Sequence, residues 1–223
     1  MLRKKNVVLV DEENRRLFVK EMDSYAMKMQ AEGWEVYVVG EVKLMLGTVV
    51  RCSPPFGKSG RYYTASHCVM DSPPFFADCA AGRDYPVIRR GNVVERSELV
   101  PYGWWCLFQD CTNKYDYAVI DVGNEGDPPQ MILSLGSTDG HLAGYTVVPG
   151  FSGNPIGRSV TYTSYDYFDL TVKKITTKVL GKGRTWAGGP NNQVYYFEVY
   201  YAYDPTQIIA RPGYSGSNVY ITS

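Results

Sequence analysis

Hydrophobic and polar residues follow two different periods along this chain. Between Asp11 and Glu32 the apolar residues recur at helical spacings with charged residues between them, which predicts a long helix. Asp11 offers an N-cap for that helix and Gly33 a stop. From Trp34 onward the period falls toward two, as is typical of strands. The pattern therefore favours an all-β protein with an N-terminal helical extension over residues 1–38.

Short strand-like runs continue to the end of the chain, separated by Gly and Pro turns. The expected strands cover residues 35–39, 43–50, 61–65, 87–100, 131–135, 144–148, 159–163, 170–180, 193–203 and 217–221. Residues 181–192 are rich in glycine and predict a surface loop. Residues 123–129 resemble a linker, so we expect two units of strands, over residues 39–126 and 127–223.

Composition narrows the range of partners. Lys and Arg number 23, as do Asp and Glu, so the net charge is zero. Neither a nucleic acid nor another strongly charged partner is implied. The basic start of the chain precedes only four consecutive apolar residues, Val7 to Val10, which is too few for a signal-peptide core or a membrane span. We expect no membrane span and a cytoplasmic or virion-associated location, and the oligomeric state is left open.

His67 is the candidate for a catalytic base. His67, one of two histidines in the chain, ends an apolar run that starts at Tyr62. It is either a satisfied core or surface side chain, or a base for catalysis. Asp116 opens a short apolar run and is either a turn residue or a carboxylate that orients the imidazole. Ser215 lies between Gly213 and Gly216, in a surface turn or in a turn that presents a nucleophile and backbone donors.

Other kinds of site are poorly supported by the sequence. The cysteines show no Cys-x-x-Cys pair with a histidine nearby, so a metal site is poorly supported. The glycine-rich stretch at 181–192 lacks the Gly-Lys-Ser/Thr ending of a phosphate loop, and no cofactor is expected. Cys106 and Cys111 can close a small loop, which leaves Cys79 over. An α/β-hydrolase is excluded because its serine precedes the acid and the histidine along the chain.

The segment Thr64-Ala65-Ser66-His67-Cys68 resembles the trypsin/chymotrypsin superfamily of serine endopeptidases, whose histidine motif reads Thr-Ala-Ala-His-Cys. Asp116 and Ser215 follow in the family's order, at intervals that suit one half of the fold and then most of the other. The resemblance implies a catalytic triad of His67, Asp116 and Ser215, with the N–H groups of Gly213 and Ser215 as oxyanion hole. It also implies a disulfide between Cys52 and Cys68.

The resemblance further implies two six-stranded antiparallel Greek-key barrels, the first carrying His67 and Asp116 and the second Ser215. Its activity would be hydrolysis of peptide bonds in a polypeptide substrate. Tyr214 stands where many members carry Asp, which argues against activation by a freed N-terminal amine. The Gly-x-Ser-Gly-Ser form is closer to the glutamyl-endopeptidase, bacterial and viral branches. By alignment with the family the primary pocket lies near Ile209, which favours an apolar substrate residue.

The end of the chain departs from the family. Only eight residues follow Ser215, whereas family members continue with one or two more strands. Either the chain is cut here, which we favour and which predicts an incomplete second barrel, or Asn6 to Val10 supply a substitute strand. The alternative function is a structural or binding module with the protease fold, of the viral scaffold or capsid type, in which the triad is vestigial or cleaves only its own chain.

Overall fold

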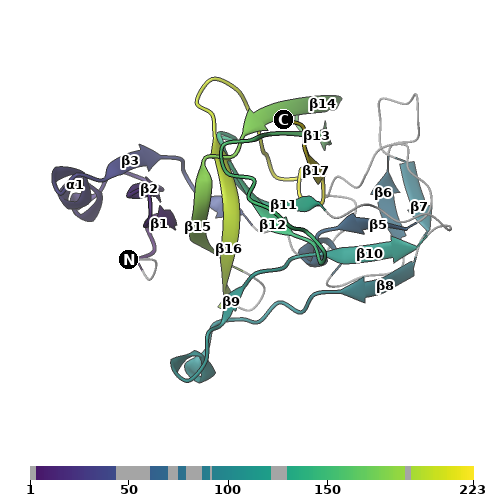
Figure 1. The fold of residues 1–223 in the computed structure, drawn as a ribbon, viewed down its shortest axis with the longest axis horizontal. Coiled ribbons are helices and arrows are strands. Elements are labelled where there is room, and N and C mark those ends of the chain that lie inside the picture. The colour runs from purple at the N-terminus through teal and green to yellow at the C-terminus, as the bar shows by residue number, and fades with distance from the viewer. Residues whose placement is uncertain are drawn as a thin grey trace.

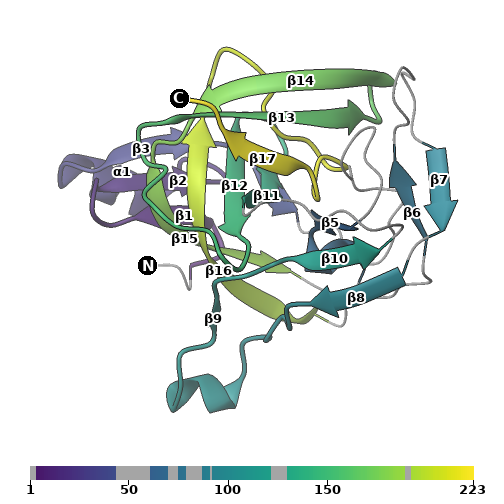
Figure 2. The same cartoon turned by 45° about the vertical axis from the view of Figure 1, so that its right-hand side comes forward.

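The computed structural model describes residues 4–43, 61–69, 75–78, 87–90, 92–121, 130–188 and 192–223. Strands dominate these residues and only one α-helix occurs among them, so the predicted all-β class is confirmed. Figures 1 and 2 show the N-terminal elements at one end, a long sheet in the middle, and the smaller sheets at the other end. No helix within the described part of the chain is long and apolar enough to cross a bilayer.

Twelve strands form the main sheet. Ten of them follow the order β14-β13-β17-β11-β12-β16-β15-β1-β2-β3, while β4 pairs with β11 and β9 with β16. The bounds are β1 Val7–Asp11, β2 Arg16–Val19, β3 Glu35–Val38, β4 Val42–Lys43, β9 Thr112–Asn113, β11 Met131–Ser137, β12 Leu142–Val147, β13 Ser159–Asp166, β14 Thr171–Lys178, β15 Gly181–Gly188, β16 Val194–Tyr203 and β17 Asn218–Ile221.

Two smaller sheets complete the described strands. One has the order β5-β10-β8 and the other pairs β6 with β7. Their bounds are β5 Arg61–Thr64, β6 Phe75–Asp78, β7 Val87–Arg90, β8 Asn92–Arg96 and β10 Ala118–Asp121, and two short 3₁₀ helices, η2 Ser66–Cys68 and η3 Trp104–Leu107, lie between strands. The pairings among the described residues give open sheets, so the two closed barrels and the unit boundaries stay predictions.

The cores show how the smaller sheet is attached to the main one. Buried side chains of β5 and β10, such as Tyr62 and Ile120, pack in one cluster with Ile132 of β11 and Val148 just after β12. A second cluster fills the space between β11, β12, β13 and β17. Each Å² of apolar surface removed from water stabilises the fold by about 25 cal/mol. The shared cluster therefore holds the two sheets together.

The long helix predicted over residues 11–32 is wrong, because α1 spans only Ser24–Ala31. Its N-cap is Asp23, whose carboxylate accepts a hydrogen bond from Ala26 N at 2.8 Å. Within the predicted range Asp11 instead ends β1, and Arg16–Val19 form β2, which pairs with β1. β2 also pairs in parallel with β3, and these neighbouring strands supply backbone partners that the local helical spacing cannot foresee.

The loop predicted over residues 181–192 is also wrong for most of its length. Gly181–Gly188 form β15, which pairs with both β1 and β16. Its residues alternate between buried and half-buried or exposed, as a strand requires. Glycine at 183 reflects close packing, since a Cβ there would lie 2.7 Å from Leu9 Cδ2 and 2.9 Å from Val10 O.

The proposed substitute strand does not take the expected position. The segment at Val7–Asp11 does join the main sheet, but it pairs with β15 and β2. The strand that follows Ser215, β17, lies between β11 and β13. The β13–β14 hairpin therefore covers the edge of β17, close to the serine.

Glycine at position 183 is expected to be required for packing. Gly183→Ala should lower the free energy of unfolding by about 1–3 kcal/mol, because its methyl group would overlap β1. Gly188→Ala in the same strand is the matched control, since a Cβ there meets nothing within 4 Å. Urea denaturation of both variants measures the difference, and equal stabilities would contradict the packing explanation.

Candidate active site

Strand register brings His67 and Asp116 together. The antiparallel pairing of β5 with β10 places Thr64 opposite Ala118. Ser66 lies two residues after Thr64 and Asp116 two residues before Ala118, and Ser66 N donates a hydrogen bond to Asp116 O at 3.1 Å. His67 follows within η2, so the side chains at the two strand ends meet although they are far apart in the sequence.

The carboxylate of Asp116 holds His67 at two points. Oδ1 accepts a hydrogen bond from the backbone N–H of His67 at 3.0 Å, and Oδ2 lies 2.7 Å from Nδ1 of the ring. Both side chains are completely buried. An ionised carboxylate only accepts hydrogen bonds, so it favours the tautomer with the proton on Nδ1. Nε2 is then the nitrogen that can accept a proton from a nucleophile.

Neighbouring groups fix the turn that carries Asp116. Ser97 Oγ accepts a hydrogen bond from Tyr117 N at 2.9 Å, and Ser66 Oγ donates to Ser97 O at 2.7 Å. The hydroxyl of Tyr117 donates to Glu95 Oε1 at 2.7 Å. Burial, reinforced by this carboxylate, raises the pKa of Tyr117 to about 12, so the phenol remains a neutral donor at physiological pH.

Ser215 lies in a turn held by the main sheet. Gly216 N donates to Leu133 O at 2.8 Å, and Leu133 N donates to Ser217 O at 3.0 Å. Gly213 and Gly216 adopt φ values of 103° and 90°, which side chains with a Cβ rarely tolerate. The Ser215 side chain is almost fully buried, and its hydroxyl donates a long hydrogen bond of 3.5 Å to Ser134 O.

One contact joins the serine turn to the histidine strand. Asn218 Nδ2 donates to Tyr63 O at 3.0 Å, which links residues three and four positions from Ser215 and His67. Within the described residues no hydrogen bond forms between Ser215 Oγ and the His67 ring. The structure therefore brings the histidine and the acid together directly, and attaches the serine turn to their strand without a serine–histidine hydrogen bond.

The predicted oxyanion hole and primary pocket involve the Ser215 N–H and the segment around Ile209. In the described part of the chain, the N–H of Ser215 makes no hydrogen bond. Ile209, expected near the primary pocket, is fully buried in the core, and its carbonyl accepts a hydrogen bond from Tyr162 at 2.7 Å. These contacts anchor the chain that leads into the turn, and the pocket's preference stays a prediction.

A buried carboxylate next to the serine was not anticipated from the sequence. Asp166, at the end of β13, accepts hydrogen bonds at Oδ2 from the Tyr214 hydroxyl at 2.7 Å and from Arg211 Nη1 at 2.9 Å. Burial alone would raise the pKa of Asp166, but these donors, together with the N–H groups of Phe168 and Asp169, lower it overall. The only signal in the sequence was an Asp just before a turn.

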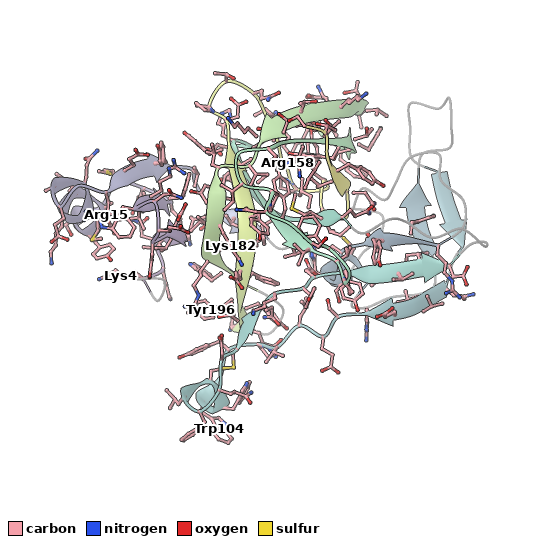
Figure 3. The ribbon with its side chains drawn as sticks, in the orientation of Figure 1. Lys4, Arg15, Trp104, Arg158, Lys182 and Tyr196 are labelled. Carbon is pink, nitrogen blue, oxygen red and sulfur yellow. A yellow bond between two sulfur atoms is a disulfide. The ribbon has the colours of Figure 1, made fainter. Side chains whose placement is uncertain are left out.

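The cysteines agree in part with the predictions. Cys68 is disulfide-bonded, while Cys52, its predicted partner, and Cys79 lie outside the described residues. Cys106 and Cys111 form the small loop that was considered possible, with an S–S distance of 1.98 Å. Trp104, which begins η3 two residues before Cys106, is 72% exposed and projects away from the sheets (Figure 3).

Fold and site together define an all-β protein with a buried histidine–carboxylate pair and a serine turn between glycines. The chain belongs to the family described as "Putative filamentous viruses peptidase", whose model matches residues 29–222. It is also similar to the "Uncharacterized 20.2 kDa protein" of Thermoproteus tenax virus 1 (strain KRA1), with 30% identity over 177 residues, or 75% of this chain and 95% of the relative. No solved structure matches the chain.

Asp166 is expected to make the folded protein sensitive to acid. Its pKa is lowered on folding, so it contributes stability above the unfolded value of about 3.9, and the contribution disappears as the pH falls through the folded value. Urea midpoints between pH 7 and pH 2 should therefore fall less steeply in acid for Asp166→Asn than for the wild type. A wild-type slope in Asp166→Asn would contradict the assignment.

Proposed function

We propose that this protein is a serine endopeptidase of the trypsin-like type, acting on a polypeptide substrate. The contact between His67 Nδ1 and Asp116 Oδ2 at 2.7 Å is the observation that carries the proposal. A buried carboxylate that orients a histidine is the arrangement that prepares a general base for a serine. Membership of a peptidase family supports the reaction class.

In the proposed mechanism Ser215 Oγ attacks the carbonyl carbon of a peptide bond, and His67 Nε2 takes the hydroxyl proton. Asp116 remains ionised and stabilises the imidazolium that forms. The N–H of Ser215, together with that of Gly213, would donate to the oxyanion. When the tetrahedral intermediate collapses, His67 returns the proton to the leaving amine, and water then hydrolyses the acyl-enzyme by the same steps.

The Ser215 hydroxyl must turn from Ser134 O toward His67 in this mechanism. Catalytic hydrogen bonds are often long or misaligned without substrate and tighten when it binds. The present bond to Ser134 O is long, at 3.5 Å, so little energy opposes this rotation. Rotation about the Cα–Cβ bond of serine moves between staggered positions and leaves the backbone in place.

The second candidate is the structural or binding module of viral scaffold or capsid type. It is favoured by the burial of the site, since Ser215 is only 3% exposed and His67 is 0% exposed, and by the missing serine–histidine hydrogen bond within the described residues. In that case the triad would be vestigial or would cleave only its own chain.

Labelling with a fluorophosphonate probe distinguishes the two functions. The wild-type protein should be labelled stoichiometrically at Ser215, as mapped by mass spectrometry, and Ser215→Ala should not be labelled. Ser134→Ala is the matched control, because its hydroxyl is buried on the neighbouring strand and bonds to Thr146, not to Ser215. A folded wild-type protein that resists the probe would support the structural module.

Asp116→Asn tests whether the carboxylate is needed to orient His67, because the imidazole itself stays in place. The amide favours the wrong tautomer of His67, so the rate of peptide hydrolysis should fall by about 10⁴-fold. His67→Ala should lower the rate at least as much. Initial rates on a denatured protein substrate measure both effects, and full activity of Asp116→Asn would rule out this role of the carboxylate.

A further inference from the structure

We propose that Tyr214, Asp166 and Arg211 form a positioning cluster that holds the serine turn in its reactive conformation. The inference rests on the proposed function of Ser215 and adds how its turn is kept ready. None of the three touches the reacting atoms in the proposed mechanism, so they are positioning residues and not catalytic ones.

The carboxylate of Asp166 is the centre of this positioning cluster. Oδ1 accepts hydrogen bonds from the N–H groups of Phe168 at 2.8 Å and Asp169 at 2.9 Å, which fix the carboxylate on its own hairpin. Oδ2 accepts from Tyr214 and Arg211. Both oxygens are therefore engaged, and a buried charge that is fully hydrogen-bonded is rigid as well as stable.

The contacts of the cluster surround Ser215 along the chain. Tyr214, immediately before the serine, is tied to Asp166 through its hydroxyl, and Tyr214 N also donates to Arg211 O at 2.9 Å. Two residues after the serine, Ser217 Oγ lies 2.5 Å from Ser164 Oγ on β13 and donates to Tyr214 O at 2.6 Å. The residues before and after Ser215 are thus anchored to the same strand.

This geometry acts on catalysis through orientation. The direction of the Ser215 N–H, the proposed oxyanion donor, depends on the peptide plane between Tyr214 and Ser215. The carbonyl of that peptide, Tyr214 O, accepts hydrogen bonds from Ser217 N at 3.2 Å and Ser217 Oγ at 2.6 Å, and the bond from the Tyr214 hydroxyl to Asp166 holds the residue from which the peptide starts. Such preorganisation lowers a barrier because no rearrangement is needed during reaction. The positive charge that pairs with Asp166 comes from Arg211, four residues before the serine. The cluster therefore does not need the freed N-terminal amine that activates many members of the resembling family.

Tyr214→Phe tests the cluster, because it removes one hydroxyl and keeps the ring in the core. We expect stoichiometric labelling of Ser215 by a fluorophosphonate at a rate on the order of 10- to 100-fold slower, since small misplacements have effects of that size. Amide hydrogen exchange in residues 211–217 should become faster. Asp166→Asn should act in the same direction, and Arg211→Lys should retain part of the labelling rate because it keeps the charge.

Tyr201→Phe is the matched control. Tyr201 also donates from a buried ring to a buried carboxylate, Asp11 Oδ2 at 2.5 Å, beside Arg16, but it lies on β16, and β12, β11 and β17 separate that strand from β13. The control should lower the unfolding midpoint to a similar extent while labelling stays within about twofold of wild type, because a buried hydrogen bond contributes similarly at both sites.

The outcomes separate this inference from the proposed function. If Tyr214→Phe slows labelling no more than Tyr201→Phe does, the positioning role is overturned while the nucleophile stands. If the wild type is not labelled at all, the proposed function fails, and hydrogen exchange alone decides the inference. Faster exchange confined to residues 211–217 in Tyr214→Phe then supports the cluster, and unchanged exchange overturns it.

Discussion

The burial of the Asp116 carboxylate against His67 is the constraint around which the rest of the site is arranged. A charge taken out of water destabilises a fold unless hydrogen bonds replace its hydration. Here both oxygens of Asp116 are bonded to the same residue, through its backbone N–H and its ring. These bonds exist only in one register of β5 against β10, since a shift by one residue would reverse every side chain of the strand. The same register buries Tyr62 and Ile120 in the cluster shared with the main sheet.

The serine turn depends on the main sheet in a comparable way. Its backbone is bonded to Leu133 of β11 just after the serine, through Gly216 and Ser217, and its side chains reach β13 through Tyr214 and Ser217. The two halves of the proposed site are therefore fixed by different sheets, and the bond from Asn218 to Tyr63 joins them. This division agrees with the proposed mechanism, in which both parts of the site are rigid and the bond between the serine and the histidine forms during the reaction.

The local motifs were the most predictable part of the site. Strand alternation is a local property, and it marks the run before His67 and the strand after Asp116. A turn that needs positive φ is also local, and it explains the glycines around Ser215. The sequence also indicated most strands of the second half. It did not indicate Asp166, because its role comes from partners 45 and 48 residues away. The helix predicted from Asp11 failed for a similar reason, since Arg16–Val19 find backbone partners in the neighbouring strands β1 and β3.

By itself, the sequence determined the all-β class, the order of the histidine, the acid and the serine, and the positions where the backbone must turn. Alternation of side chains and the conformational freedom of glycine are local properties, so they can be recognised without a structure. Only the tertiary structure decided that residues 181–188 form a strand, that β13 covers the edge of β17, and that a tyrosine and a buried aspartate support the serine turn. Those features depend on which strands become neighbours, and that choice is made by packing across the whole sheet.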